Sequence, residues 1–383
     1  MKNYKAILAA LAISAFAITG CGDKEAKPQE AEVTLDGQSS MDMGDGGEEV
    51  VDQTPVEGEV APEGMYRSEL TNEWISEDIK DQRPIAVMVD NEKTALPHYG
   101  VNDADVVYEM MNSTMNGRVT RLMVVMKDWK NIEQLGSVRS TRPTNVMIAG
   151  EYNAILIHDG GPFYINDYLG RKWSNNLSGG FARYSNGKSQ EFTEYVTSET
   201  YNNSTTGKSY SGLIQRVEDA GYSETYNDYY PGQHFIFYQG ELDLSTLADS
   251  EEATDISLPF PHNSSELHYN PDTKLYEYSE YGMEHIDPLD NDNVLAFKNV
   301  ILQDCTFSQL DNNGYLVYNV LDEKEDGYYI TNGYAIPIYW SKNQENAVTV
   351  FYNANTGEQI QLNTGKTYIA IVPDDSWDEV TLK

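Results

Sequence analysis

Four arginines give the sequence its most concentrated chemistry. The chain contains only 26 Lys and Arg among 383 residues, yet four of its arginines fall within 25 positions: Arg118, Arg121, Arg139 and Arg142. Arg139 and Arg142 have helical spacing at the start of a predicted helix, where free N–H groups and the positive end of the helix dipole favour anions. Because forked guanidinium groups suit phosphate or carboxylate, the pattern predicts a focused positive site for an anionic ligand. The alternative is that Arg139 pairs internally with an acidic side chain and only stabilises the fold: Asp105, Glu109 or Asp159.

His158, Asp159, Gly160 and Gly161 form a second candidate binding motif. They complete and follow the apolar run 154–158, and open α/β sheets bind ligands beyond the carboxyl ends of their strands. The glycines would allow close approach of the backbone, and His158 could act as an acid, a base or a hydrogen-bond donor. The alternative is a structural turn in which the backbone satisfies His158.

The remaining histidines and cysteines match no metal or nucleophile motif. His262 and His268 have no Cys or His partner at zinc-ligand spacing, so neither a metal ion nor a cofactor is expected. No serine, cysteine or second histidine is spaced to form a nucleophile motif with His158, and the sequence does not identify the chain as an enzyme. Cys305 ends the apolar run 299–305 and is expected to be a buried, inert thiol on a strand.

The chain is rich in tyrosine, with 28 tyrosines and only 10 phenylalanines. A tyrosine presents a flat apolar face and a polar tip, which suits sugar rings and protein partners. Four tyrosines occur together in a polar segment: Tyr222, Tyr226, Tyr229 and Tyr230. The alternative is that tyrosine replaces phenylalanine in the sheets throughout the chain.

An apolar leader ends at Cys21. Lys2 and Lys5 precede the apolar run 6–19, and small residues stand just before the cysteine. This layout predicts a bacterial lipoprotein signal peptide over residues 1–20, with diacylglycerol on the sulfur of Cys21 and cleavage before that residue. The run is shorter than the ~20 residues of an ordinary spanning helix, and the alternative is an uncleaved N-terminal anchor. Either way, we expect the chain outside the cytoplasm, on the outer leaflet of the cell membrane.

The formal net charge of −35 excludes a large class of functions. Such a polyanion repels nucleic acid and anionic lipid surfaces, so nucleic-acid binding is not expected, whereas glycans remain suitable partners. Residues 22–64 contain thirteen Asp or Glu and no aromatic side chain. Because this composition cannot offset the entropy lost on ordering, we expect the lipidated cysteine to be followed by an acidic, disordered tether over residues 21–79.

The elements that position the candidate residues are predicted from apolar patterns. Compact apolar runs predict buried strands at 85–89, 105–109, 121–126 and 154–158. Residues 141–153 have helical spacing, with Pro143 in the first turn, and helical parts are expected within 190–220. Alternation of strands and helices predicts an α/β (α+β) domain over 80–250, with a mixed sheet and flanking helices. Short alternating strands then predict a smaller β-rich domain over 251–383.

Several blocks of sequence occur in an order that resembles a known family. They lie at 83–88, 104–109, 120–121, 136–143, 158–161, 329–335, 340–342 and 362–368. In this order they resemble the YerB family of Gram-positive lipoproteins, a two-part domain of unknown function. The likeness spans about 83–373, and Gly136 to Pro143 (GSVRSTRP) is its most specific part. The resemblance implies a two-part fold and a lipid anchor but no defined activity, and a long tyrosine-rich region between the two parts departs from the family pattern.

A second, weaker likeness concerns the elements that carry the arginines. The order of these elements is similar to that in the LytR-CpsA-Psr phosphotransferases: a strand with Arg121, then residues 137–142 entering a helix, then a Gly-Gly turn. Those enzymes transfer cell-wall polymers from polyprenyl pyrophosphate carriers, with arginines on the pyrophosphate and aspartates for Mg²⁺. The likeness implies that Arg121, Arg139 and Arg142 would bind phosphate, with Asp90 or Asp105 near a metal ion.

Three hypotheses about function therefore stand together. In the first, a non-catalytic envelope protein binds an anionic or glycan ligand, or a membrane partner, at the face of Arg139 and His158. In the second, a phosphotransferase-like enzyme acts on lipid-linked wall precursors at the same face. In the third, the tyrosine-rich surface recruits other proteins.

Overall fold

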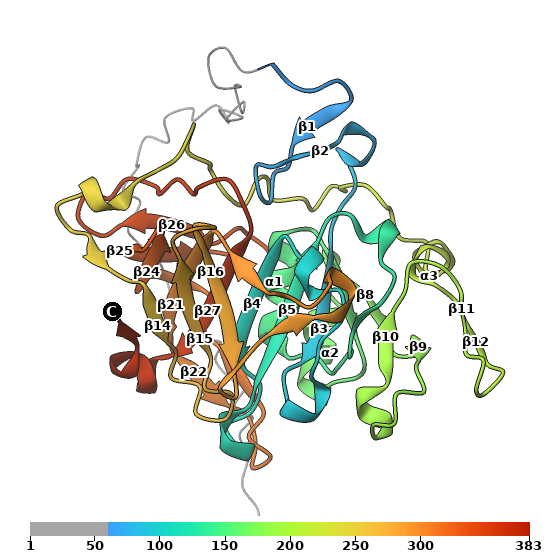
Figure 1. Cartoon of the computed structure of the whole chain (residues 1–383). Helices are drawn as coiled ribbons and strands as arrows, with labels where there is room; N and C mark the ends of the chain where they lie inside the picture. Colours follow the sequence, from blue (N-terminus) through green and yellow to red (C-terminus); the bar gives the residue numbers. More distant parts are fainter. Residues whose placement is uncertain (1–59) are drawn as a thin grey trace, which may run out of the picture. The chain divides into compact units, whose positions relative to one another are not determined.

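An 11-stranded mixed sheet organises the computed structural model, which describes residues 60–383 (Figure 1). The predicted signal peptide, Cys21 and most of the predicted tether lie outside the described residues. In spatial order the strands are β13 (Glu251–Glu252), β25 (Tyr334–Lys342), β24 (Asp322–Thr331), β21 (Asn299–Cys305), β27 (Thr367–Pro373), β4 (Val106–Met111), β5 (Thr120–Met126), β3 (Ile85–Asp90), β7 (Ile155–His158) and β8 (Asn175–Ser178), with β26 (Val350–Asn353) beside β25.

The centre of this sheet is buried on both faces. In β3, Ile85, Val87 and Val89 belong to one hydrophobic core, whereas Ala86 and Met88 belong to the other. Successive side chains of a strand point to opposite faces, so a strand that is covered on both sides reads as a continuous apolar run. This is why the four compact runs correctly predicted β3, β4, β5 and β7.

Different layers cover the two faces of the main sheet. Helix α1 (Pro143–Glu151) contributes Val146 and Ile148 to the core that contains Ala86. A six-stranded antiparallel sheet contributes Leu267 to the opposite core. Its strands are β17 (Met283–Glu284), β16 (Leu275–Glu280), β15 (Glu266–Asn270), β14 (Asp255–Ser257) and β28 (Thr381–Leu382), with β20 (Ala296–Phe297) beside β16.

The two predicted segments contribute strands to the same sheet. Strand β27, from the C-terminal segment, pairs in parallel with β4, from the N-terminal segment, between Val106↔Thr367 and Met110↔Ile371. In Figure 1 the orange-brown strand β21 and the red strand β27 accordingly lie in the same sheet as the blue-to-green strands β4, β5 and β3. The two segments share both cores, because their side chains occur in each of the two clusters.

Ordered structure begins before residue 80, where the predicted tether ends. Strands β1 (Met65–Arg67) and β2 (Trp74–Ser76) form an antiparallel hairpin. Leu70, between them, is buried in the core that contains α1. Aromatic and apolar residues in this stretch therefore allow it to pack against the rest of the fold.

Helices are fewer and shorter than the sequence predicted. Apart from α1 they are α2 (Asn166–Leu169) and α3 (Leu213–Asp219) within the described residues. The helical prediction within 190–220 holds only for α3 and a short 3-10 turn. Three short strands also lie in this stretch: β10 (Glu194–Val196), β11 (Tyr201–Asn202) and β12 (Ser209–Tyr210). Tyr, Val, Thr and Asn in this stretch favour strands and turns over a helix. The fold is thus a mixed α/β arrangement dominated by strands, with a second sheet in place of helices over one face.

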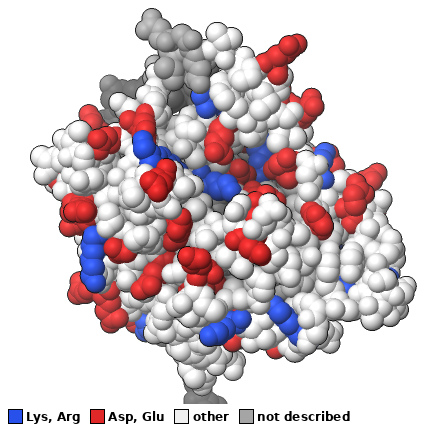
Figure 2. Space-filling model, viewed as in Figure 1, with Lys and Arg blue, Asp and Glu red and all other residues white. Residues whose placement is uncertain are grey.

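The molecular surface carries charges of both signs. Acidic side chains are spread over the face shown in Figure 2, with Lys and Arg interspersed. Across residues 60–383 no helix has both the length and the apolar character needed to cross a membrane. The other short strands are β6 (Leu135–Gly136), β9 (Ala182–Arg183), β18 (Ile286–Asp287), β19 (Asn293–Val294), β22 (Phe307–Gln309) and β23 (Leu316–Tyr318).

Candidate anion site

Three of the four predicted arginines meet at the ends of the central strands. Arg121, near the start of β5, lies opposite Asp90, the last residue of the antiparallel strand β3. The segment 137–142 crosses this end of the sheet. The backbone N–H of Arg139 donates to the carbonyl of Met88 at 2.9 Å, and the Asp90 N–H donates to Ser137 at 2.9 Å. Short strands that end together thus hold the arginine-bearing segment in place.

Ser140 connects two of the arginines. Nη1 of Arg121 donates to the carbonyl oxygen of Ser140 at 2.5 Å and to its hydroxyl oxygen at 3.0 Å. Nη1 of Arg142 also donates to that hydroxyl, at 3.2 Å. Arg139 is adjacent in sequence, and we refer to Arg121, Arg139 and Arg142 as the arginine cluster.

The arginine cluster is short of negative charge. Nε of Arg139 lies 2.6 Å from Oδ2 of Asp90, and its Nη2 lies 2.9 Å from Glu191. Arg121 and Arg142 are each only 6% exposed, and within residues 60–383 neither forms an ion pair with a carboxylate. Burial of a charge is costly unless the charge is paired, so this arrangement is electrostatically unfavourable without a further anion.

Backbone carbonyls partly compensate for that burial. Arg142 donates to the carbonyl oxygens of Asn112 at 3.1 Å and Thr141 at 2.9 Å, and its guanidinium lies 4.8 Å from the ring centre of Tyr315. Nε of Arg121 is buried and has no hydrogen-bond partner. The cluster therefore has donor capacity that the described residues do not use.

The pKa values of the two buried arginines reflect this environment. Burial, together with the charge of Arg121, lowers the pKa of Arg142 to about 9. Burial also lowers the pKa of Arg121 to about 10, with the charge of Asp90 opposing and that of Arg139 adding to the effect. Perturbed ionisable groups that repel one another are a common feature of ligand sites.

Arg118 does not belong to the cluster. Its two terminal nitrogens form a bidentate pair with Asp375, at 2.7 and 2.6 Å, and Nη1 also donates to Ser376. This pair joins the loop before β5 to the C-terminal 3-10 turn (Asp374–Glu379). Arg118 is thus a structural ion pair by its contacts and serves as a natural control for the cluster.

The predicted acidic partners of Arg139 are also placed elsewhere. Arg139 forms ion pairs with Asp90 and Glu191, and not with Asp105, Glu109 or Asp159. Asp105 accepts a hydrogen bond from the N–H of Lys127 at 2.7 Å, and burial raises its pKa to about 7. The internal pairing predicted for Arg139 therefore exists, but with different carboxylates.

The turn 158–161 is hydrogen-bonded to the arginine-bearing segment 137–142. Nδ1 of His158 lies 2.8 Å from the carbonyl of Gly160, and its Nε2 lies 3.2 Å from the side-chain oxygen of Asn176. The carbonyl of Gly160 also accepts from the N–H of Thr141 at 3.1 Å. A Cβ on Gly161 would lie 2.9 Å from the carbonyl oxygen of Thr141, so only glycine fits beneath the segment. These contacts agree with the alternative in which residues 158–161 form a structural turn and the backbone satisfies His158.

Asp159 takes part in a separate group of charges. It lies 3.3 Å from Nη2 of Arg183, which also pairs with the buried Glu194 at 2.5 Å. Burial, together with the nearby Asp159 carboxyl, raises the pKa of Glu194 to about 7. Asp159 is itself exposed and its backbone N–H donates to Arg139 at 2.9 Å, so it borders the arginine cluster without contributing a side chain to it.

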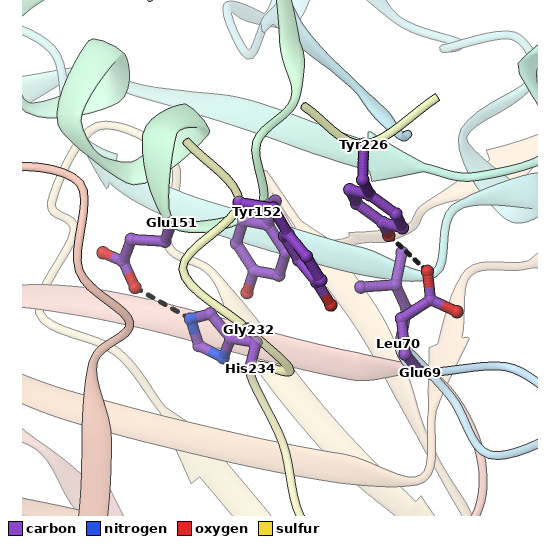
Figure 3. A pocket seen from close by; sticks show the side chains of 8 residues that line it. Glu69, Leu70, Glu151, Tyr152, Tyr226, Gly232 and His234 are labelled. Carbon is purple, nitrogen blue, oxygen red and sulfur yellow. Dashed lines mark hydrogen bonds and ion pairs between the residues drawn. The ribbon is translucent and has the colours of Figure 1, made fainter. Parts of the chain in front are cut away.

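Two of the clustered tyrosines line a shallow depression with about 180 Å³ of empty space (Figure 3). Its polar groups bond to one another. Tyr226 donates to Glu69, and Glu151 accepts from His234 at 2.8 Å. Tyr222, outside the depression, donates to the backbone of Asn176, whereas Tyr229 is 40% exposed. The lining residues are Glu69, Leu70, Glu151, Tyr152, Tyr226, Tyr230, Gly232 and His234.

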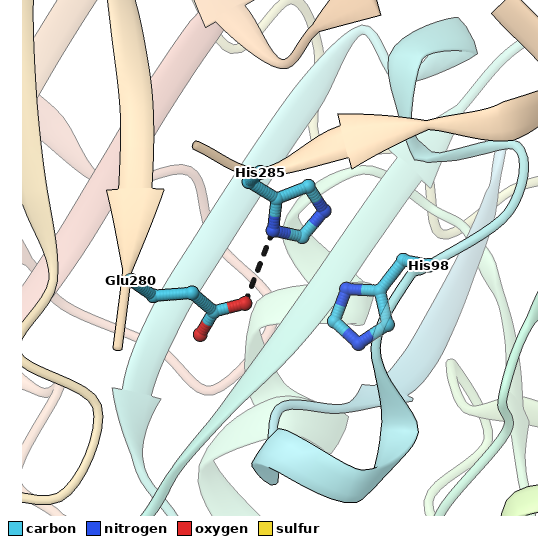
Figure 4. A group of neighbouring side chains, drawn as sticks. All are labelled: His98, Glu280 and His285. Carbon is cyan, nitrogen blue, oxygen red and sulfur yellow. Dashed lines mark hydrogen bonds and ion pairs between the residues drawn. The ribbon is translucent and has the colours of Figure 1, made fainter. Parts of the chain in front are cut away.

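Sequence reasoning missed a group of buried titratable side chains, formed by His98, Glu280 and His285 (Figure 4). Their ligand-capable atoms lie within 4.8 Å of one another. Glu280 and His285 are five residues apart, but His98 comes from a distant part of the chain, so local spacing could not have revealed the group of three. His262 and His268, which the sequence analysis considered, are not part of the group.

Comparisons with known proteins place the chain in a family. Sequence models for the N-terminal and C-terminal domains of a protein of unknown function, DUF3048, match residues 70–211 and 256–369. A Bacillus subtilis (strain 168) protein named "Putative lipoprotein YerB" is 24% identical over 319 residues, which cover 80% of this chain and 86% of that protein. The crystal structure of the YerB protein from Bacillus subtilis has a TM-score of 0.65 at 20% identity, covers 83% of this chain and 99% of that one, and shows the same fold. The predicted resemblance to YerB is confirmed, and the chain belongs to the DUF3048 family of unknown function.

Proposed function

We propose that this chain is an extracytoplasmic lipoprotein, anchored at Cys21, whose arginine cluster binds a phosphate-bearing ligand. The observation that carries the proposal is the burial of Arg121 and Arg142 without a carboxylate partner. The name of the Bacillus subtilis relative supports the anchor, and the leader that ends at Cys21 supports the location outside the cytoplasm.

The charges favour phosphate over a single carboxylate. Two guanidinium groups converge on Ser140, and a third, Arg139, is tied to Asp90. A phosphate offers three acceptor oxygens and up to two negative charges, so it can engage several arginines at once. It would also offset the mutual repulsion that lowers the pKa of Arg142.

The exposed members of the site define the direction of approach. The side chain of Arg139 is 31% exposed and Ser140 is half-buried, whereas Arg121 and Arg142 lie behind them. A ligand would first meet Arg139 and the Ser140 hydroxyl, and then compete for the donors that Arg121 and Arg142 direct at Ser140. On a chain with a net charge of −35, binding depends on these short-range contacts.

The same geometry bears on the phosphotransferase hypothesis. The likeness implied Asp90 or Asp105 near a metal ion. The Asp90 carboxylate is paired with Arg139, and the half-buried Asp105 accepts from the Lys127 backbone. Neither carboxylate faces the cluster as a free metal ligand, so the arrangement supports binding of a phosphate group more than its transfer.

Calorimetric titration of the full chain in detergent with inorganic pyrophosphate tests the proposal. The wild-type chain should bind, and binding should weaken as salt is added. Arg142→Gln should weaken binding about 10–100-fold, since a hydrogen bond to a charged group contributes about 1.5–3 kcal/mol. Arg118→Gln is the matched control and should bind like the wild type.

A second arm identifies the source of the phosphate. Polyprenyl pyrophosphate in the same detergent should bind more tightly than free pyrophosphate if a lipid-linked precursor is the ligand, and equally if only the phosphate group is bound. Thermal unfolding of each variant checks that it is folded. Absence of pyrophosphate binding to the wild type, or equal binding by a folded Arg142→Gln chain, would refute the proposal.

A further inference from the structure

The group of His98, Glu280 and His285 lies where the two family segments meet. His98 follows the short 3-10 turn Lys93–Ala95, in the N-terminal segment. Glu280 ends β16, and His285 follows β17, both in the C-terminal segment. All three are buried, with exposures of 0%, 1% and 3%, and Figure 4 shows their side chains turned toward a common centre.

Hydrogen bonds leave Nδ1 of His98 available and place Nδ1 of His285 beside the Glu280 carboxylate. Nε2 of His98 lies 2.5 Å from the carbonyl oxygen of Asp90 and must donate to it, so the proton resides on Nε2 and Nδ1 carries a lone pair. That Nδ1 is buried without a hydrogen-bond partner. Nδ1 of His285 bonds to Oε1 of Glu280 at 3.1 Å, and its Nε2 is likewise buried and unpartnered.

This pattern is the one that metal-binding histidines show. Such a histidine donates its second ring N–H to a carbonyl or carboxylate, which fixes the tautomer and directs the other nitrogen at the ion. The Asp90 carbonyl does this for His98. Asn263 similarly donates to Oε2 of Glu280, at 3.2 Å, and orients that carboxylate. Hydrogen-bond partners that would orient His98 and Glu280 as ligands are therefore already in place.

Uncompensated negative charge points to a cation at the same place. Glu280 and the neighbouring Glu109 are both buried, and within residues 60–383 neither forms an ion pair with Lys or Arg. Glu109 is satisfied by hydroxyl and amide donors: Asn91, Thr120, Ser265, Tyr278 and Tyr368. Glu280 has no comparable set of donors, and an ion bound to it would supply the missing positive charge.

We propose that His98, Glu280 and His285 bind one divalent transition-metal ion of the zinc class. Two imidazoles and one carboxylate are a donor set that suits Zn²⁺, and a fourth position stays open for water. Bonds of about 2 Å require the ligand atoms to be about 3.3 Å apart, so the side chains must draw together slightly from their present separations. His285 would bind through Nδ1, the nitrogen beside Oε1 of Glu280, and its proton would move from Nδ1 to Nε2, so that both histidines bind as neutral imidazoles.

The proposed ion would join the two segments of the family. One ligand belongs to the match at 70–211 and two belong to the match at 256–369. Because the group is buried, the ion would be taken up as the chain folds, and its binding free energy would add to the stability of the fold. This inference is independent of the proposed anion function.

Refolding of the full chain with and without Zn²⁺ tests the proposal. The denatured chain is stripped with a chelator, refolded in detergent with an equimolar amount of Zn²⁺, desalted and analysed for metal content. We expect one equivalent of zinc per chain and a higher unfolding midpoint than that of the metal-free sample. With Co²⁺ in place of Zn²⁺, a visible absorption band of a four-coordinate N/O site should appear.

Two variants and one control locate the ion. His98→Gln and Glu280→Gln should each lose at least tenfold in zinc affinity, whereas His268→Gln should retain it, because His268 is exposed and pairs with Asp255. X-ray absorption at the zinc edge of the wild type should show nitrogen and oxygen neighbours without sulfur, which keeps the test valid if a variant does not fold. Zinc below a tenth of an equivalent in refolded wild type, a sulfur neighbour, or undiminished binding by folded His98→Gln would overturn the proposal.

Discussion

Asp90 contacts Arg139 through its side chain and His98 through its backbone. Its carboxylate lies 2.6 Å from Nε of Arg139, and its carbonyl oxygen lies 2.5 Å from Nε2 of His98. Asp90 thus lies between the arginine cluster and the buried histidine group and contacts both. A substitution in the arginine cluster is therefore expected to affect the histidine group through Asp90, and a substitution in the histidine group to affect the arginine cluster.

The Asp90–Arg139 ion pair should be measurable by a double-mutant cycle. Arg139→Gln leaves the Asp90 carboxylate, which is 4% exposed, without its main cation, and we expect a loss of about 1–3 kcal/mol in the free energy of unfolding. Asp90→Asn/Arg139→Gln should recover part of that loss. Urea denaturation of the four chains gives the coupling energy. Additive single-variant effects would show that the pair does not contribute.

Glu151 should control stability in acid. Burial opposes its ionisation, but Lys342 and His234 hold the pKa of Glu151 down to about 2. A carboxyl with a depressed folded-state pKa contributes stability above its unfolded pKa, and that contribution is lost as the pH falls from about 4.5 toward 2. At pH 7, Glu151→Gln should lower the free energy of unfolding by about 3–5 kcal/mol, since Lys342 stays buried and unpaired.

The matched control for Glu151 is an exposed carboxylate. Glu345 pairs with Arg171 at the surface, at 2.8 Å, and Glu345→Gln should change stability by less than about 1 kcal/mol. Urea denaturation at pH 7, 5 and 3 compares the variants. A difference between wild type and Glu151→Gln that stays constant over this range would contradict the prediction.

Asp105 should have the opposite pH dependence. Burial raises the pKa of Asp105 to about 7, although the Lys127 N–H bond opposes this. A raised carboxyl pKa means that the folded state loses stability as the pH rises from about 4 through 7. Asp105→Asn should therefore be more stable than wild type at pH 8, by an amount on the order of 2 kcal/mol. Equal unfolding midpoints at pH 8 would be inconsistent with an ionised, buried Asp105.

Neither segment should fold by itself. Strand β27 lies between β21 and β4, so residues 53–250 alone would leave the edge of β4 uncovered and both cores incomplete. Expressed separately, 53–250 and 251–383 should each lack a cooperative thermal transition, and mixing them should restore one. A cooperative transition in either piece alone would show that it is an independent domain.

The sequence predicted the central sheet well because its strands are buried on both faces. Continuous apolar runs such as Ile85 to Val89 have few other interpretations. The hairpin near Leu70 and the small strands after Gln190 were missed, since short, half-exposed strands carry little periodicity. Strand order across the sheet was also out of reach, because β27 reaches β4 over most of the chain length.

The candidate site was predicted in part, for a related reason. The arginine block is local, so Arg121, Arg139 and Arg142 were expected together, and they meet around Ser140. Arg118 was included by proximity in sequence, but it lies in the 3-10 turn Asn116–Arg118 and pairs with Asp375. His98 lies far from Glu280 and His285 in the chain, so only tertiary structure brings the three together.

Binding of an anion at the arginine cluster can be observed directly by NMR. The measurement is a titration of the ¹⁵N-arginine-labelled chain with pyrophosphate, following the Nε–Hε signals after assignment with single Arg→Gln variants. We expect saturable shifts for Arg121, Arg139 and Arg142, and an unchanged signal for Arg118. Shifts confined to Arg118 and other surface arginines, or none at all, would contradict binding at the cluster.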